Sequence, residues 1–186
     1  ALTRAIAGQE TVERGEALVL CEHDGEWTMG LYLRDDALGA GAPDPFHSDA
    51  DFGAACLAAE GVSHFVYLQY RSAQDASTTE LELELQAEVD KWALGVLGEG
   101  VLAGNGVGLI KERSRAMRER LFAQVTLRDP PESERGERYR TALRFAARYA
   151  ADLERRYVET GEVDGLLAEL RRFYRLGTGD KLAYIR

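Results

Sequence analysis

The stretch STTELELELQAEVDKW, residues 77–92, fits two kinds of secondary structure, and the choice between them decides the fold. The alternation of Glu and Leu over residues 80–85 is typical of a half-buried strand. Against this, Ser77 and Glu80 match a helix capping box. An apolar stripe at helical spacing also runs past the end of the alternation, through Leu81, Leu85, Val89, Trp92 and Val96. The sequence therefore predicts a helix, which Gly98 ends.

Three more helices are predicted after residue 100. Residues 138–157 carry an unbroken apolar stripe over about five turns, formed by Tyr139, Ala142, Leu143, Ala146, Tyr149, Ala150, Leu153 and Tyr157. Residues 109–125 and 163–174 carry shorter stripes of the same kind. Pro130 and Pro131 lie between residues 109–125 and residues 138–157, so these two segments cannot form one continuous helix.

The N-terminal third of the sequence, in contrast, contains segments typical of strands. Residues 17–22 and 26–33 are rich in strand formers, and the intervening Asp24-Gly25 pair favours a tight hairpin turn. Residues 35–48 combine Gly, Pro and Asp without periodicity, which predicts a surface loop. Residues 49–60 look helical, with Gly61 as a stop, and the apolar run 62–70 is typical of a strand buried on both faces.

Strands followed by helices predict an α+β fold. We expect a small, mostly antiparallel sheet of about three strands in the N-terminal third, followed by about four helices. A chain of 186 residues lies within the usual size of one domain, so we expect residues 1–186 to form a single domain.

Composition and charge narrow the class of protein. Residues 1–100 hold 5 Lys and Arg against 19 Asp and Glu, whereas residues 101–186 hold 18 against 13. A net charge of −9 disfavours nucleic acid as a partner, because binding to phosphates requires a basic surface. No apolar run is long enough for a membrane span, and the charged N-terminal residues do not resemble a signal peptide. We therefore expect a soluble, cytoplasmic protein with Cys21 and Cys56 as two free thiols.

Known chemical motifs are absent or malformed. The glycine-rich GNGVG at 104–108 matches neither the dinucleotide-binding pattern G-x-G-x-x-G nor the P-loop pattern G-x-x-x-x-G-K-[ST]. His23, His47 and His64 share no metal-ligand spacing, so neither a metal site nor a cofactor is expected. His64 fits a buried core histidine better than a general base, but it remains a candidate ligand-binding residue.

The candidate binding residues form a row, Arg140, Arg144 and Arg148, at a spacing of four. Stacked guanidinium groups can bind phosphate or carboxylate. The same spacing occurs in Glu80, Glu84 and Glu88, so the two rows are expected to pair across packed helices.

Two functions remain open at this level. The first is a regulatory or protein-interaction domain without catalytic activity, with a protein partner or a second copy as its ligand. The alternative is an enzyme or sensor that binds a phosphorylated or carboxylated small molecule through the arginine row, with residues 35–48 as a lid.

Overall fold

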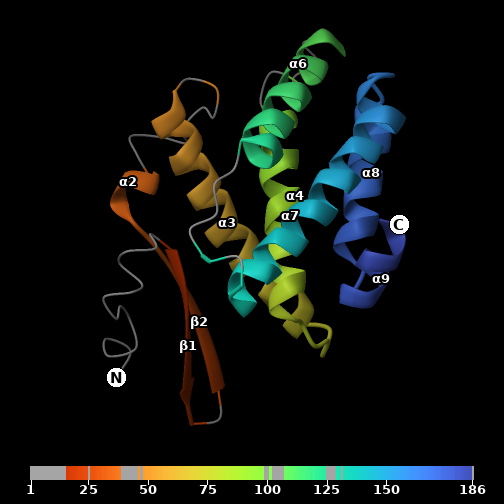
Figure 1. The fold of residues 1–186 in the computed structure, drawn as a ribbon. Coiled ribbons are helices and arrows are strands. Elements are labelled where there is room, and N and C mark those ends of the chain that lie inside the picture. The colour runs from red at the N-terminus through yellow and green to blue at the C-terminus, as the bar shows by residue number, and fades with distance from the viewer. Residues whose placement is uncertain are drawn as a thin grey trace. The chain divides into compact units, whose positions relative to one another are not determined.

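The computed structural model describes residues 16–24, 26–38, 46, 48–98, 101, 107–124, 129–130 and 132–185. This part of the chain is mostly helical and contains a two-stranded antiparallel sheet (Figure 1). It divides into two compact units, residues 1–76 (unit 1) and residues 77–186 (unit 2). The predicted α+β class is confirmed, but the expected three strands and four helices are not matched in detail. The expectation of a single domain over residues 1–186 stays a prediction.

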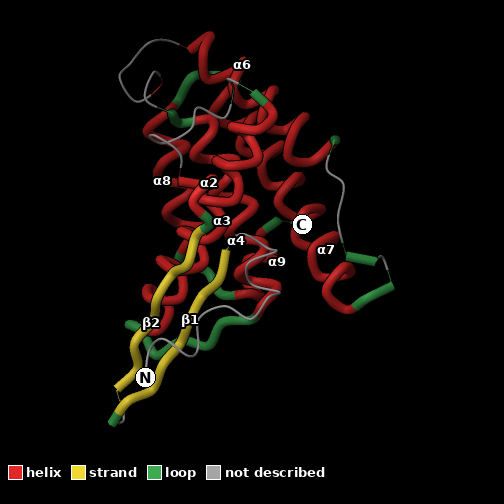
Figure 2. Tube along the Cα trace, turned by 90° about the vertical axis from the view of Figure 1, so that its left-hand side faces the viewer, coloured by secondary structure: helices red, strands yellow, loops and turns green. Residues whose placement is uncertain are grey.

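The sheet of unit 1 is the predicted hairpin, formed by β1, Glu16–His23, and β2, Glu26–Leu33 (yellow in Figure 2). Pairing of His23 with Glu26 leaves a two-residue turn. Asp24 has a positive φ of 52°, the left-handed conformation that tight hairpin turns require. The other predicted turn residue, Gly25, lies outside the described residues.

The helix α3, Asp49–Ser72, corrects two predictions, the stop at Gly61 and the strand at 62–70. It begins at Ser48, whose hydroxyl accepts a hydrogen bond from the backbone N–H of Asp51 at 3.1 Å. The run 62–70 was predicted as a buried strand because it is rich in apolar residues, but in the structure several polar residues of the run are buried and several apolar ones are exposed. Its buried residues at helical spacing are Ser63, His64 and Tyr67, whereas Val62 and Val66 are 46% and 47% exposed.

Gly61 continues α3 because the hairpin packs closely against it. A Cβ at this position would lie 2.7 Å from Cδ2 of Leu33 and 3.1 Å from Cδ1 of Leu31. Glycine at position 61 therefore allows the hairpin to pack closely against α3, and it does not end the helix.

Gly61→Val is expected to lower the free energy of unfolding by about 1–3 kcal/mol, because the added methyl groups push the hairpin away from α3. Urea unfolding of the full chain measures the effect. Gly53→Val is the matched control, because a Cβ at Gly53 in the same helix meets nothing within 4 Å. Equal effects of the two substitutions would contradict this packing role.

The predicted loop at 35–48 is partly helical. The short helix α2, Asp35–Leu38, occupies its first residues, and Ala37 is buried. Phe46 and Ser48 are also described, whereas residues 39–45 and His47 lie outside the described residues.

Unit 2 is built around α4, Glu80–Val96, the helix predicted from the opening stretch. Its cap is Thr79, whose hydroxyl accepts a hydrogen bond from the N–H of Glu82 at 3.1 Å, so the capping residue lies two positions after the predicted Ser77. α4 packs against α6, Val107–Arg118, and against α7, Glu134–Leu153. Most residues of α4 are buried, including the apolar Leu85, Val89, Trp92 and Val96.

The remaining helices of unit 2 are α8, Val163–Tyr174, as predicted, and α9, Thr178–Tyr184, which was not predicted. α6 and α7 each continue into a short π-helix, η2 over Glu119–Ala123 and η3 over Glu154–Val158. The π-helix η3 begins with Glu154, which accepts a hydrogen bond from buried Ser114 at 2.9 Å and pairs with Arg118. These contacts join α6 to the end of α7.

Candidate functional site

The predicted arginine row lies on α7, a helix whose sequence explains its limits. The hydroxyl of Ser133 caps it by accepting a hydrogen bond from the N–H of Gly136 at 3.0 Å. Its buried residues share one side and face the core of unit 2: Gly136, Ala142, Ala146, Tyr149, Ala150 and Leu153. The apolar stripe predicted for this helix is therefore its core-facing side.

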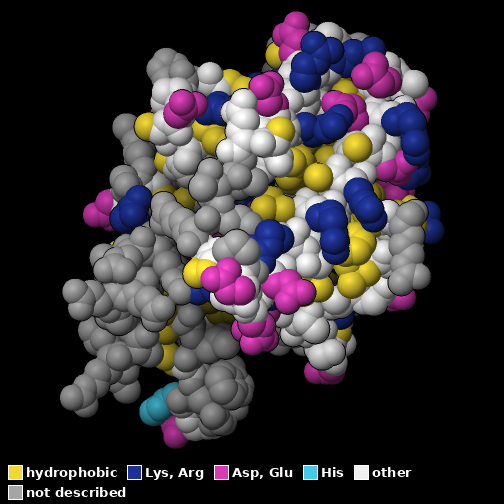
Figure 3. Space-filling view, viewed as in Figure 1, with side chains coloured by type: hydrophobic (Ala, Val, Ile, Leu, Met, Phe, Trp, Pro, Cys, Tyr) yellow, Lys and Arg dark blue, Asp and Glu magenta, His cyan; other side chains and the backbone are white. Residues whose placement is uncertain are grey.

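The three arginines occupy the opposite side of α7. At 100° of rotation per residue, Arg140, Arg144 and Arg148 point roughly away from the buried stripe and span about 12 Å along the helix. Arg144 and Arg148 are exposed, and Arg140 is half-buried. We call these three residues the arginine ridge. Figure 3 shows Lys and Arg side chains gathered over the helices of unit 2, with hydrophobic side chains between them.

The other arginines near the start of α7 have carboxylate partners. Nη1 of Arg138 lies 2.6 Å from Oε2 of Glu80, and Nε of Arg135 lies 3.5 Å from Oδ2 of Asp129. Within the described part of the chain, none of the ridge arginines forms an ion pair; the guanidinium of Arg144 lies 5.4 Å from the ring centre of Phe145. The ridge therefore presents positive charge that the described residues do not neutralise.

The expected pairing of the two charged rows is wrong, although α4 and α7 do pack together. Glu80 pairs with Arg138 and not with the ridge. Glu84 and Glu88 are buried, and Glu88 contacts Lys91 at 2.5 Å. The rows share a spacing, but the ridge faces away from the core-facing side of α7, so equal spacing does not bring them together.

His64 lies on α3 in unit 1, whereas the ridge lies in unit 2. Its Nδ1 atom is 3.8 Å from Oε1 of Glu16, and the histidine is buried. This environment is that of a core histidine beside a carboxylate. A ligand-binding role for His64 together with the ridge stays a prediction.

A polar cluster between α7, α8 and α9 escaped the sequence analysis. Tyr184 donates a hydrogen bond to Glu169, whose carboxylate is also 3.6 Å from Arg156. Tyr149 stacks on Phe173, with ring centres 4.1 Å apart. Burial raises the pKa of Tyr149 above its ordinary value, and the nearby carboxylate of Glu169 raises it further.

One weak signal in the sequence pointed to a neighbour such as α9, the helix that supplies Tyr184 to this cluster. Glu82, Gln86 and Asp90 place polar groups at a spacing of four on α4, which suggests a polar neighbour. The neighbour of Glu82 and Gln86 is α9, whose seven residues are too few to show a periodic pattern.

No group of three or more His, Cys, Asp or Glu side chains within the described ranges could hold a metal ion. In the same part of the chain, every helix is too short or too polar to cross a membrane.

Comparison with protein families, curated proteins and solved structures finds no match to this chain.

Proposed function

We propose that the chain is a protein-interaction domain without catalytic activity, which binds an acidic segment of a partner protein through the arginine ridge. The observation that carries the proposal is that Arg140, Arg144 and Arg148 line the outer side of α7 without an ion pair among the described residues. Exposed guanidinium groups in a line match a row of carboxylates or phosphates.

The position of the ridge along α7 argues against a purely local role. Arginine in the last turn of a helix stabilises that helix through its dipole, as Arg171 and Arg172 do in α8. The last turn of α7 holds no basic residue, and the ridge lies in the middle of the helix. Three mid-helix arginines at like-charge spacing instead destabilise an isolated helix slightly.

A macromolecular partner fits this surface better than a small molecule. The ridge lies on the outward side of a helix, where each guanidinium can reach a different charge of an extended segment. A small phosphate or carboxylate would contact one or two of these groups and stay open to water, where each ion pair contributes only about 0.2–1 kcal/mol. The alternative function, an enzyme or sensor for an anionic small molecule, is therefore placed second.

A cytoplasmic location is part of the proposal. Cys21 and Cys56 are not joined by a disulfide bond, as expected from the sequence, and reduced thiols suit a reducing compartment.

Arg144→Gln/Arg148→Gln is expected to weaken binding of a fluorescein-labelled peptide of ten glutamates by about fivefold or more, because two exposed ion pairs are lost. Fluorescence anisotropy at low ionic strength measures the dissociation constant. Binding should weaken further when salt is added.

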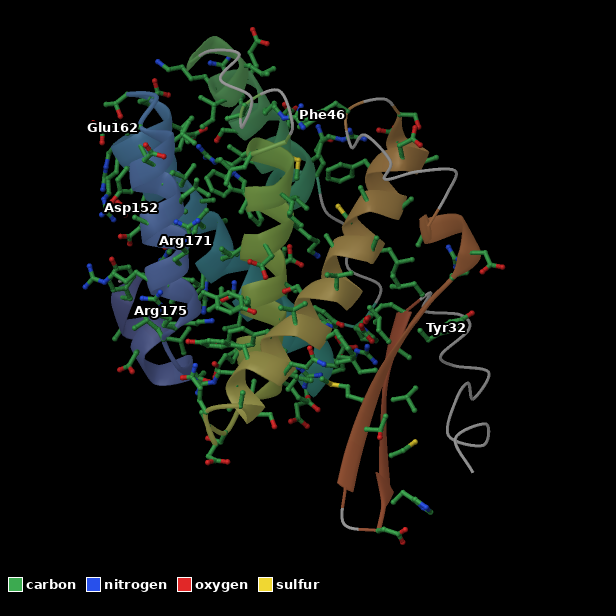
Figure 4. All side chains as sticks on the ribbon, turned by 180° about the vertical axis from the view of Figure 1, so that it is seen from behind. Tyr32, Phe46, Asp152, Glu162, Arg171 and Arg175 are labelled. Carbon is green, nitrogen blue, oxygen red and sulfur yellow. The ribbon has the colours of Figure 1, made fainter. Side chains whose placement is uncertain are left out.

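The matched control is Arg171→Gln/Arg175→Gln, which removes two exposed guanidinium groups, also one turn apart: Arg171 lies in the last turn of α8, and Arg175 is the C-cap residue of this helix (Figure 4). It should change the affinity for the peptide much less than the ridge variant does. Equal losses in the two variants would show that the peptide responds to total charge, and the ridge would lose its role. A titration with inorganic phosphate separates the alternative: phosphate that displaces the peptide at sub-millimolar concentration would favour the small-molecule function.

A further inference from the structure

The arginine ridge is bordered on both sides by apolar side chains that the core of unit 2 does not fully cover. At 100° of rotation per residue, Leu143 lies about 100° to one side of Arg144 around α7, and Phe145 lies about 100° to the other side. Both side chains are half-buried, and neither is among the buried residues of α7. The outer side of this helix therefore has a basic centre with an apolar border on each side.

Arg144 and Phe145 form one combined surface. The guanidinium carbon of Arg144 lies 5.4 Å from the ring centre of Phe145. Cation–π attraction holds a guanidinium group near a ring at this distance, while its N–H groups still donate to an acceptor. A carboxylate bound to Arg144 would thus lie beside an aromatic ring, where an apolar group of the same partner gains from burial.

The charges of the ridge do not by themselves select the conformation of a bound segment. Successive ridge arginines are about 6 Å apart along α7. Carboxylates at every second residue of a strand repeat at about 7 Å, and carboxylates at every fourth residue of a helix repeat at about 6 Å. Long arginine side chains can follow either spacing, so the apolar borders supply the difference.

A helix can cover the ridge and a border at once, whereas a strand cannot. A strand that pairs with all three arginines uses every position on that face for a carboxylate, and its other side chains point away from α7. A helix places the residue after each carboxylate in a row beside the acidic row. These two rows pack onto the ridge and its border as the side chains of packed helices do.

We propose that the partner segment docks on the arginine ridge as an amphipathic helix, in which carboxylates repeat every four residues and each is followed by an apolar residue. This inference rests on the proposed function, because it takes the ridge as the binding surface. In one chain direction the apolar row lies over Phe145, and in the other direction it lies over Leu143. Carboxylates at this spacing slightly destabilise an isolated helix, so the segment gains helical structure on binding.

Two fluorescein-labelled 15-residue peptides of identical composition test the conformation. Both carry glutamate at positions 4, 8 and 12 and have only alanine and glutamine besides leucine. The first has leucine at positions 5, 9 and 13, which a helix places beside the glutamates. The second has leucine at positions 6, 10 and 14, which a helix places on the opposite side and a strand places on the same face as the glutamates.

Fluorescence anisotropy with the 186-residue chain at low ionic strength should give a dissociation constant about tenfold lower for the first peptide, because its leucines are buried against α7. Proline at position 10 of the first peptide should weaken binding by about tenfold, since proline breaks a helix. Circular dichroism of the mixture should show more helix than the sum of the separate spectra.

Equal affinities of the two peptides, or tighter binding of the second, would overturn the helical docking. If Arg144→Gln/Arg148→Gln still weakens both peptides in that case, the ridge keeps its proposed function as a site for acidic segments. Binding that the ridge variant leaves unchanged, or no binding of either peptide, would contradict the proposed function itself. Arg171→Gln/Arg175→Gln is again the control and should change both affinities much less.

Discussion

Trp92→Ala is expected to lower the free energy of unfolding by about 3–5 kcal/mol, the range for removing a large aromatic side chain from a packed core. Trp92 is fully buried on α4, the helix that packs against both α6 and α7. The cavity left by the indole would remove contacts that these helices share. Urea unfolding followed by circular dichroism measures the change.

Trp92→Phe separates the packing contribution from the polar one. The indole Nε1 of Trp92 is buried and forms no hydrogen bond with the described residues. Phenylalanine removes this unsatisfied donor while it keeps a ring in the core, so we expect a cost below about 1.5 kcal/mol. A loss as large as that of Trp92→Ala would contradict the view that ring packing dominates at this position.

Lys91→Met is expected to lower the free energy of unfolding by about 3 kcal/mol, near the lower end of the range for breaking a buried ion pair. Lys91 and Glu88 are both buried on α4, and the ammonium nitrogen lies 2.5 Å from a carboxylate oxygen. Methionine has a similar length but leaves the carboxylate of Glu88 without this contact. Equilibrium unfolding in urea measures the loss.

Two variants test the origin of that loss. Lys111→Met removes the half-exposed lysine that pairs with Glu159 at 3.2 Å, and it should change stability by less than about 1 kcal/mol. Glu88→Met/Lys91→Met replaces both buried charges by apolar groups and should recover most of the stability. A double variant as unstable as Lys91→Met alone would mean that the two charges are not coupled.

The long periodic helices could be predicted from the sequence. α7 and α8 have apolar residues at helical spacing, and both helices appear where the pattern places them. The hairpin could also be predicted, because Asp24-Gly25 fixes both the turn and the register of the flanking strands. These elements follow from local sequence, so a single chain contains the necessary information.

The second half of α3 could not be predicted, because tertiary packing outweighs local preference there. The β-branched and aromatic residues of the run 62–70 favour a strand. Ser63 and His64 lie on the buried side, and Gly61 accommodates the hairpin instead of ending the helix. None of these facts can be read from residue types alone.

The arginine ridge could be located from its spacing, but its neighbours could not. Spacing of four places Arg140, Arg144 and Arg148 on one side of α7, and it does the same for the glutamates of α4. The side of each helix that faces the core is set by its apolar stripe. On α4, Glu84 and Glu88 are buried although they are charged, so the sequence does not show which side of this helix faces the core. The contact of α9 with α4 joins residues that are 95 positions apart, Gln86 and Lys181, so it requires the structure.

The most direct test of ridge function is an NMR titration that follows the side-chain Nε–H resonances of arginine in the 186-residue chain. The decaglutamate peptide is added in steps at low ionic strength. We predict saturable shifts of Arg140, Arg144 and Arg148 that share one dissociation constant and disappear at high salt, while Arg171 and Arg175 change little. Shifts of similar size at all exposed arginines, or at Arg171 and Arg175 alone, would contradict a binding role for the ridge.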